Sequence, residues 1–426
     1  MNILMMTNTF TPHLGGVARS VERFSAEFRR LGHQVLVVAP TYDKMPEKES
    51  DVVRVPAVQN FNGSDFSVVL PIAGLLSDAI DDFAPDLIHS HHPFLLGGTA
   101  LRIANIHDLP LVFTHHTMYE QYTHYVPGNS TRLQQFVMKL STSYANLCNM
   151  VFAPSDSVAK ILEGRGVTTP IKVVPTGVNG HQFARGSGSG FRAVMEIPQD
   201  AFVIGHLGRL APEKNLEFLA RAVVKYLQSN PNARFLLIGV GPSEQVVRRI
   251  FSDHNLQSRL YIVHALEHPL LASAYKAMDL FVFCSKSETQ GMVLTEAMAA
   301  STPVIALDAP GVREVVVDAE NGRLLSGDSI EQFTDALHWA FSLPAAKKKE
   351  LHQTALQTAE KFSMERTAAT ALSHYEQVLT NGFAADKEKH CSVWQSMQRL
   401  IKIEWRIIKN VIDAADAAMS SEEESG

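Results

Sequence analysis

Two carboxylates that could hold one ligand lie eight positions apart, at Glu288 and Glu296. The apolar run 279–284 comes directly before them and predicts a buried strand, and the Ala-, Met- and Leu-rich run 291–300 predicts a helix. A helix rises about 1.5 Å per residue, so the second glutamate would lie roughly 7 Å along the axis from the start of the helix. The spacing favours two carboxylates that hold different hydroxyls of one long ligand over a pair that shares a proton. The alternative is a helix-capping carboxylate followed by a solvated helix glutamate.

The glycine between the two carboxylates points to an anion. Gly291 permits close approach of the backbone, so the N–H groups of Gly291, Met292 and Val293 at the start of the helix can face a negatively charged group. A sugar, a diphosphate and a ribose in one molecule would satisfy both glutamates and the amides between them.

A second loop adds the cations that a diphosphate requires. An apolar run over 201–206 predicts a strand, and the loop that follows it carries Arg209 and Lys214 ahead of a predicted helix at 216–227. Arginine offers a planar fork of donors and lysine a point charge, which together suit a diphosphate. Two solvated loop cations are the alternative.

These motifs carry a family resemblance. Glu288 and Glu296 match the Glu-x7-Glu signature of the family 4 retaining glycosyltransferases, and Gly208–Asn215 resembles the Gly-Arg-Leu-x-x-x-Lys-x loop of that family. The pair His116-Thr117 matches the His-Thr of the same enzymes. The resemblance implies an α/β fold of two Rossmann-like doubly wound parallel-sheet domains, known as GT-B.

The resemblance also assigns roles to a glycine pair near the N-terminus and to His116. Gly15 and Gly16 open a helix after the first predicted strand, but the chain lacks the Gly-x-Gly-x-x-Gly dinucleotide pattern. In the resembled family this loop lies over the donor phosphate and the reacting sugar, although the glycines could also form a plain turn. The resemblance implies that His116 and Glu288 are catalytic, with His116 stabilising the sugar and the charge that develops at its anomeric centre.

The acceptor is suggested by the run that follows His116. The segment 116–125, together with 85–94 and 54–56, most resembles the bacterial diacylglycerol glucosyltransferases, and the likeness covers about the first 380 residues. It implies transfer of a hexose, expected to be glucose, from a nucleotide-diphosphate sugar to a membrane lipid such as diacylglycerol. The acceptor-side residues are then Tyr119, Glu120, Tyr122 and His124. The predicted helix over 130–148 carries only two basic residues, fewer than is usual in the lipid enzymes, so a soluble sugar or glycan acceptor stays open. A non-catalytic carbohydrate-binding protein is a third reading, which the joint presence of all these motifs disfavours.

Histidines at two strand ends invite a metal hypothesis that their spacing does not support. His89, His91 and His92 form one cluster and His115 and His116 another, at the C-termini of two predicted strands, with no His-x3-His pair on one helix. The chain also contains no Asp-x-Asp, the motif with which metal-dependent glycosyltransferases hold the diphosphate. We therefore expect no metal and no cofactor, with the nucleotide sugar as a substrate and with Arg209, Lys214 and the helix start at Gly291 in place of the ion.

Composition sets the remaining bounds. The 426 residues are 46% hydrophobic with a net charge of −6, which gives no global basic field for nucleic acid. Three distant cysteines form no disulfide framework, and no signal peptide or membrane-spanning run is evident, so a cytoplasmic location is expected.

Four segments are expected along the chain. The first is an N-terminal acceptor domain over 1–185, and a flexible linker at Gly186–Gly190 joins it to the second, a nucleotide-sugar domain over 191–362. The third is a crossover helix over 363–382 that returns to the first domain. The fourth is a helical extension with an acidic tail over 383–426.

The extension has no counterpart in the resembled family. Trp394, Met397, Ile401, Trp405, Ile408 and Ile412 recur at helical spacing, and six basic residues against two glutamates give 387–412 a local charge of +4. A basic amphipathic helix with tryptophans can lie on the cytoplasmic face of an anionic membrane. Packing on the first domain is the equally weighted alternative.

Overall fold

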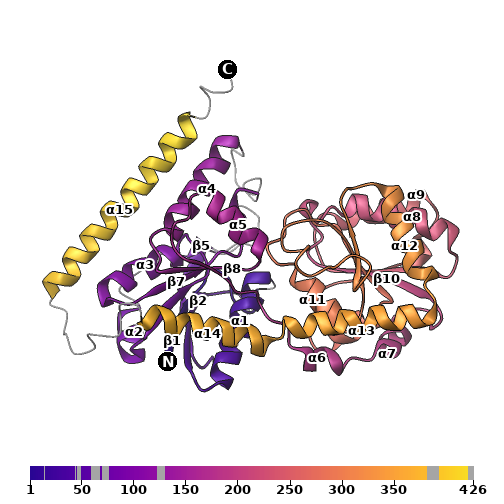
Figure 1. Ribbon diagram of the computed structural model, residues 1–426, viewed down its shortest axis with the longest axis horizontal. Helices are drawn as coiled ribbons and strands as arrows, with labels where there is room; N and C mark the ends of the chain where they lie inside the picture. Colours follow the sequence, from indigo (N-terminus) through magenta and orange to yellow (C-terminus); the bar gives the residue numbers. More distant parts are fainter. Residues whose placement is uncertain are drawn as a thin grey trace. The chain divides into compact units, whose positions relative to one another are not determined.

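The computed structural model describes residues 1–13, 15–43, 45, 49–58, 68–69, 76–121, 130–380 and 393–420. They divide into two compact units, which we call unit 1 (Met1–Gly177 with Thr367–Gly426) and unit 2 (Val178–Arg366). The fold class expected from the sequence is confirmed, since each unit is built on a parallel sheet with helices on both faces (Figure 1).

Unit 1 contains a seven-stranded sheet in the order β3-β2-β1-β6-β7-β8-β9. Every pairing in it is parallel, for example Met5 with Val37 in β1 and β2 and Met5 with His89 in β1 and β6. A separate antiparallel pair joins β4 and β5. The strands are β1 Asn2–Met6, β2 Gln34–Pro40, β3 Val52–Val55, β4 Ala57–Val58, β5 Val68–Val69, β6 Leu87–Ser90, β7 Leu111–Thr114, β8 Met150–Ala153 and β9 Ile171–Val173.

Helices cover both faces of this sheet (Figure 1). Phe28 of α1 and Tyr375 of α14 are in edge contact at 5.7 Å, and both are fully buried against the sheet. The opposite face packs on α3, α4, α5 and α15 through a continuous apolar cluster. The helices are α1 Gly16–Arg30, α2 Ser77–Phe83, α3 Leu96–His107, α4 Thr131–Ala145, α5 Asp156–Gly164, α14 Met364–Thr380, whose first residues belong to unit 2, and α15 Val393–Ser420.

Unit 2 contains a six-stranded parallel sheet in the order β12-β11-β10-β13-β14-β15. Along each strand the buried residues alternate between two apolar clusters, as Val203 and Ile204 do, because successive side chains point to opposite faces. The strands are β10 Phe202–Leu207, β11 Ala233–Ile238, β12 Leu260–Val263, β13 Leu280–Phe283, β14 Val304–Leu307 and β15 Gly322–Leu325.

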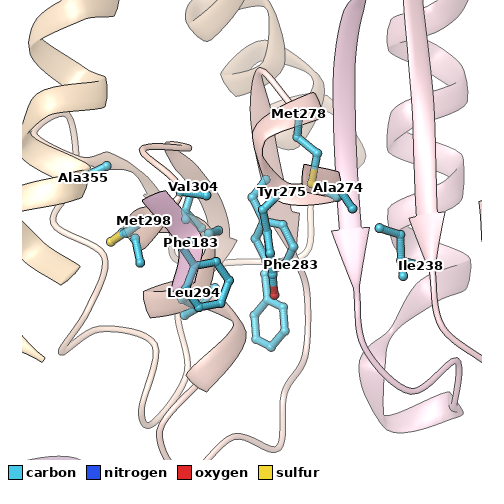
Figure 2. Packing of buried hydrophobic residues seen from close by; sticks show 14 of the residues in the cluster. Phe183, Ile238, Ala274, Tyr275, Met278, Phe283, Leu294, Met298, Val304 and Ala355 are labelled. Carbon is cyan, nitrogen blue, oxygen red and sulfur yellow. The ribbon is translucent and has the colours of Figure 1, made fainter. Parts of the chain in front are cut away.

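Each cluster of unit 2 is closed by its own layer of helices (Figure 1). Helices α8, α9 and α12 cover one face, and α6, α7, α10, α11 and α13 cover the other. Figure 2 shows the second cluster, in which Tyr275 packs among Phe183 and Phe283. The helices are α6 Gly180–Ala184, α7 Gly188–Val194, α8 Leu216–Ser229, α9 Glu244–Asp253, α10 Leu270–Ala277, α11 Met292–Ala299, α12 Ile330–Ser342 and α13 Ala345–Lys361.

The prediction of a flexible linker at Gly186–Gly190 is wrong. The chain passes from unit 1 to unit 2 between Gly177 and Val178, and the glycine-rich segment leads into α7 inside unit 2. A side chain on Gly186 would place its Cβ 2.5 Å from the backbone of Ala272, and one on Gly188 would come within 2.1 Å of the Lys276 carbonyl. The glycines therefore allow close packing against α10, a role that composition alone does not distinguish from flexibility.

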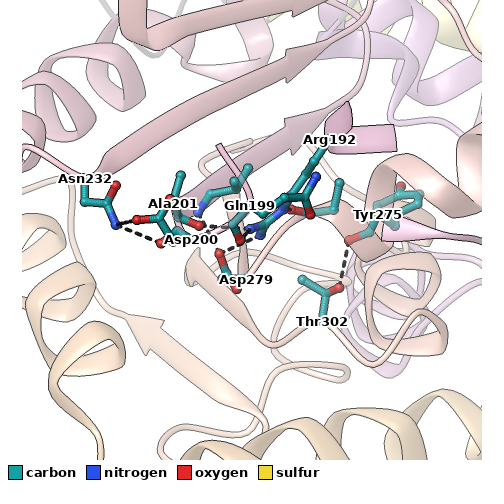
Figure 3. Close-up of polar contacts among 10 residues, drawn as sticks. Arg192, Gln199, Asp200, Ala201, Asn232, Tyr275, Asp279 and Thr302 are labelled. Carbon is teal, nitrogen blue, oxygen red and sulfur yellow. Dashed lines mark hydrogen bonds and ion pairs between the residues drawn. The ribbon is translucent and has the colours of Figure 1, made fainter. Parts of the chain in front are cut away.

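A buried arginine fixes α7 in that position. The Arg192 guanidinium donates to the carbonyls of Gln199, Ala201 and Ala277 and to the carboxylate of Asp279, at 2.9–3.0 Å (Figure 3). Asp279 also accepts from the Val203 N–H, at 2.7 Å. These contacts join α7 to the entrance of β10 and β13, the two central strands of the sheet.

The C-terminal extension packs on unit 1, and its packing face is not the one named from the sequence. Ile403 is 2% exposed and belongs to the core of unit 1, with Leu400 and Ile407 packed beside it. Ion pairs from Arg102 to Glu404 at 2.5 Å and from Arg399 to Asp108 at 2.9 Å fix the helix on α3. The side chains of Trp394 and Met397 lie outside the described residues. No helix in the described part of the chain combines the length and apolar character needed to cross a bilayer.

Candidate functional site

In unit 2 the cationic loop and the first glutamate of the carboxylate pair follow neighbouring strands. Strands β10 and β13 are parallel neighbours, and the order of strands reverses between them. In open α/β sheets, ligands bind beyond the carboxyl ends of the strands at such a switch point. The loop with Arg209 and Lys214 leaves β10, and the turn with Glu288 leaves β13, so both flank the point where a ligand is expected.

Each of the two cations has a carboxylate partner. The Lys214 ammonium is in direct contact with the Glu288 carboxylate, and the two side chains are only 16% and 15% exposed. Arg209 donates to Glu213 at 2.5 Å. An ion pair that is largely removed from water restricts both side chains, so Glu288 holds Lys214 in position. Among the predicted residues, the structure thus brings Lys214 and Glu288 together across the switch point.

Helix α11 begins where the sequence placed the anion site. Gly291 has the left-handed backbone conformation, with φ 68°, and caps the helix whose first residues are Met292 and Val293. Gly311, from the loop after β14, approaches so closely that a Cβ would lie 2.5 Å from the Gln290 nitrogen. Two glycines therefore determine the path of the turn, since any larger residue at either position would displace it.

Glu296 has a different partner from Glu288. It is 3% exposed, and the buried Tyr275 hydroxyl donates to its carboxylate at 3.0 Å. The two carboxylates of the pair therefore have separate hydrogen-bond partners, in keeping with different roles toward a ligand. Tyr275 is packed in the core of unit 2 (Figure 2), so its hydrogen bond fixes the rotamer of Glu296.

Sequence reasoning missed His206, which lies on β10 directly before the cationic loop. Its Nδ1 donates to the Val282 carbonyl at 2.9 Å, and its buried Nε2 has no hydrogen-bond partner among the described residues. Burial lowers the pKa of His206 to about 4, and nearby Lys214 adds to this. The imidazole is therefore neutral beside the Lys214–Glu288 pair.

In unit 1, strand β7 places His116 beside a second histidine. The Nε2 of His116 and the Nδ1 of His91 are 2.9 Å apart, and the rings are stacked with centroids at 5.2 Å. Strand β6, which ends directly before His91, neighbours β7 in the sheet, so the carboxyl ends of the two strands bring the histidines together. This contact was not predicted, because its members are 25 residues apart in the chain.

The protonation of this pair follows from the groups around it. His91 Nε2 is buried with no partner among the described residues. An unpaired N–H is the rarer and costlier buried group, so we infer that His91 carries its proton on Nδ1 and donates it to His116. His116 is then a neutral imidazole protonated on Nδ1.

A third histidine connects this pair to α14. The Tyr375 hydroxyl and the Nδ1 of His89 are 2.6 Å apart, and the other ring nitrogen of His89 is 2.7 Å from the Thr114 hydroxyl. The ring centroids of His89 and His91 are 4.1 Å apart. We call His89, His91 and His116 the histidine layer. Tyr375, which lies 286 positions along the chain from His89, contacts this layer from α14.

The glycine pair opens α1 at the matching switch point of unit 1, between β1 and β6. Gly15 is the residue before the helix, and a Cβ on it would meet His13 at 3.0 Å, whereas a Cβ on Gly16 would meet nothing within 4 Å.

The turn after β1 is held by Asn8. Its backbone N–H donates to His92 Nδ1 at 3.1 Å, and its side chain donates to the Phe94 carbonyl, also at 3.1 Å.

The predicted acceptor-side residues are placed only in part. Tyr119 packs edge-on against Phe94 at 5.3 Å, close to His115 at 6.0 Å. Glu120 forms an ion pair with Arg165 at 2.7 Å, which ties it to the end of α5. Tyr122 and His124 lie outside the described residues.

The residues that sequence reasoning missed share one feature. His206, Tyr275, His91 and Tyr375 act through partners far away in the chain, so no short motif marks them. The only local signal was the pair of histidine clusters at strand ends. Across the described ranges, no group of three or more His, Cys, Asp or Glu side chains has the arrangement to hold a metal ion.

Comparison with known proteins gives concordant matches to both halves of the chain. Residues 14–181 match the profile of Glycosyltransferase Family 4, and residues 190–358 match that of Glycosyl transferases group 1. The alpha-monoglucosyldiacylglycerol synthase of Acholeplasma laidlawii is 27% identical over 336 residues, covering 76% of this chain and 84% of that protein. The synthase of the same name from Streptococcus pneumoniae is 28% identical over 342 residues, covering 77% and 76%. Among solved structures, sucrose-phosphate synthase of Thermosynechococcus elongatus superposes with a TM-score of 0.74 at 20% identity, covering 89% of this chain and 99% of that one.

The buried histidines predict that unit 1 loses stability in mild acid. Burial lowers the pKa of His89 and His92 to about 3 and that of His115 to about 4, and the pKa values of His91 and His116 also fall well below 6.5. Below pH 6.5 the unfolded chain binds protons that the native state does not. Each such histidine therefore removes up to about 1.4 kcal/mol of unfolding free energy per pH unit as the pH falls toward the native pKa.

Two buried thiols, Cys148 in unit 1 and Cys284 in unit 2, allow the loss to be assigned to a unit. In urea titrations at pH 7.5 and 5.0, labelling with 4,4′-dithiodipyridine and mass spectrometry would report the exposure of each. We expect the midpoint for Cys148 to fall more than that for Cys284, because burial lowers the pKa of five histidines at the strand ends of unit 1, whereas in unit 2 it lowers the pKa of His206. An equal fall at both thiols, or a larger one at Cys284, would contradict the neutral histidine layer.

Proposed function

The chain belongs to the family 4 glycosyltransferases, which have the GT-B fold of two Rossmann-like domains, and from this we propose that it is a retaining hexosyltransferase that uses a nucleotide-diphosphate sugar. The observation that carries the proposal is the charge arrangement of unit 2. Arg209 and Lys214, in the loop after β10, are each held by a glutamate, and Lys214 is held across the switch point by Glu288, which follows β13.

The donor diphosphate would lie against these cations and the start of α11. Negative charge on the leaving diphosphate grows as the bond to the sugar breaks, and preorganised cations and helix amides stabilise such charge. Glu288, which is paired with Lys214, would accept hydrogen bonds from hydroxyls of the hexose. Glu296, whose position is fixed by Tyr275, would do the same for the ribose.

The reaction that we propose is same-face attack. The bond from the anomeric carbon to the diphosphate oxygen breaks, and the acceptor oxygen bonds to the same face of that carbon. The proton of the acceptor hydroxyl passes to an oxygen of the leaving diphosphate. Neutral His116 would stabilise the sugar while positive charge develops at the anomeric carbon, which a protonated imidazole would repel.

For the acceptor we propose a membrane lipid such as diacylglycerol, with unit 1 as the acceptor unit and with glucose as the hexose. The support is the resemblance of 116–125 and the printed names of the two relatives, both monoglucosyldiacylglycerol synthases. A location at the cytoplasmic face of the membrane, with contact through 387–412, belongs to the same proposal. A soluble sugar or glycan is the second candidate, and a panel of the two acceptor classes separates them.

Removal of either cation tests the donor site. We expect Arg209→Ala and Lys214→Ala each to lower kcat/KM by about 30- to 150-fold, because a lost charged hydrogen bond is worth about 2–3 kcal/mol. Arg221→Ala is the matched control, since Arg221 pairs with Glu217 on the exposed face of α8. We expect this control to stay within about threefold of the parent protein. Near-normal turnover in both site variants, with circular dichroism showing an intact fold, would remove the assignment.

Metal independence is tested by chelation. We propose that Arg209, Lys214 and the α11 N-terminus stabilise the leaving group without an ion, so turnover should persist largely unchanged after dialysis against EDTA. A loss of turnover that Mn²⁺ or Mg²⁺ restores would instead assign the leaving group to a metal.

A further inference from the structure

Helix α15 has two apolar faces, of which one is buried against unit 1 and the other is exposed. Its inner face packs on α3 and α4 through Ile403, and the ion pairs of Glu404 with Arg102 and of Arg399 with Asp108 set its rotation about its own axis (Figure 1). The orientation of the outer face is therefore fixed by the fold of unit 1.

The outer face carries a stripe of large apolar side chains. Ile401, Trp405, Ile408 and Ile412 are 56%, 69%, 50% and 54% exposed. Their spacing of four, three and four residues places them in one line along the helix, about 17 Å long at 1.5 Å per residue. We call these four residues the outer stripe. A contiguous exposed apolar patch on a protein surface is a mark of an interaction site.

Basic residues accompany the outer stripe along one side. Lys402, Arg406 and Lys409 each follow a stripe residue by one position, which places all three about 100° around the helix, and all are exposed. The one acid between Ile401 and Ile412, Glu404, is engaged by Arg102, and the next exposed acid, Asp413, lies past the end of the stripe. The outward surface of this stretch is therefore apolar and positively charged.

We propose that the outer stripe docks on an anionic bilayer, with α15 lying in the plane of the interface. Ile401, Ile408 and Ile412 enter the boundary between headgroups and acyl chains, Trp405 lies at the headgroup level, and the three basic residues contact lipid phosphates. This inference deepens the proposed function, since it rests on a lipid acceptor and names the surface by which unit 1 would reach it.

A second copy of the chain fits the stripe less well. Antiparallel pairing of two outer stripes would bring the basic side of one helix against the basic side of the other, which repels. Four side chains would also bury only roughly a few hundred Å² per copy, well below the ~800 Å² per partner of a stable protein interface. An anionic surface satisfies both the apolar and the charged part of the face.

The test uses the full-length protein and vesicles of phosphatidylcholine with 30% phosphatidylglycerol, compared with phosphatidylcholine alone, in a flotation assay. We expect binding to the anionic vesicles at 50 mM salt and weak binding at 500 mM salt, because the charge attraction is screened. Trp405→Ala combined with Ile408→Ala should weaken binding at least tenfold. Replacing Lys402, Arg406 and Lys409 by Gln should weaken it by about 100-fold at low salt, since each basic residue contributes about fivefold.

The matched control combines Val194→Ala with Leu270→Ala, which removes exposed apolar side chains from unit 2 and should leave vesicle binding unchanged. Thermal unfolding must be the same in all variants. The proposal is overturned if the parent protein ignores anionic vesicles at 50 mM salt, or if the stripe variant binds as the parent does. It is also overturned if sedimentation velocity shows a dimer that the stripe variant abolishes without changing vesicle binding.

Donor hydrolysis separates this inference from the proposed function. Turnover of nucleotide sugars in the absence of vesicles should be equal, within about threefold, in the parent and the stripe variant. Vesicle binding without any donor turnover would support membrane docking and overturn the proposed enzymatic function. Donor turnover without vesicle binding would support the enzymatic function and overturn membrane docking.

Discussion

The interaction on which the site of unit 2 depends is a largely buried ion pair between Lys214 and Glu288. It joins the loops that follow the two strands between which the sheet reverses its order. The neighbouring Arg209 is paired with Glu213 at the start of the same loop as Lys214. Both cations are therefore held in place by carboxylates of the protein itself. A diphosphate would meet preorganised positive charge at the carboxyl ends of the strands, and little rearrangement would be needed.

The cations of the unit 2 site form ion pairs, whereas unit 1 contains buried titratable groups that are neutral. Its histidines at the ends of β6 and β7 are buried together, and burial with mutual repulsion keeps them neutral. The hydrogen bond from His91 then fixes the tautomer of His116, as partners of a functional histidine commonly do. Unit 2 thus presents fixed cations, and unit 1 presents a neutral imidazole.

The features that the sequence predicted are those with local signals. The apolar run before Glu288, Gly291 at the start of α11 and the strand before Arg209 each depend on neighbours within about ten residues, and the structure places all three as expected. The partners of the site residues could not be read in this way. Tyr275 reaches Glu296 from another helix, and Tyr375 reaches His89 from the far end of the chain.

One prediction failed and another was incomplete for a related reason, since composition does not reveal what a residue packs against. The glycines at 186–190 suggested flexibility, whereas they let α7 approach α10. In α15 one apolar face was recognised, but Leu400, Ile403 and Ile407 form a second face that only the packing on α3 and α4 makes visible. A helix with two apolar faces can be built into the domain and still present a surface to the outside.

The most direct test of the account is to incubate the pure protein with a panel of nucleotide-diphosphate sugars and with diacylglycerol in detergent, following the anomeric proton by NMR. We expect that a donor is consumed, that its nucleoside diphosphate is released, and that the product keeps the α configuration of the donor. Failure to consume any donor, or a product with inverted configuration, would contradict it.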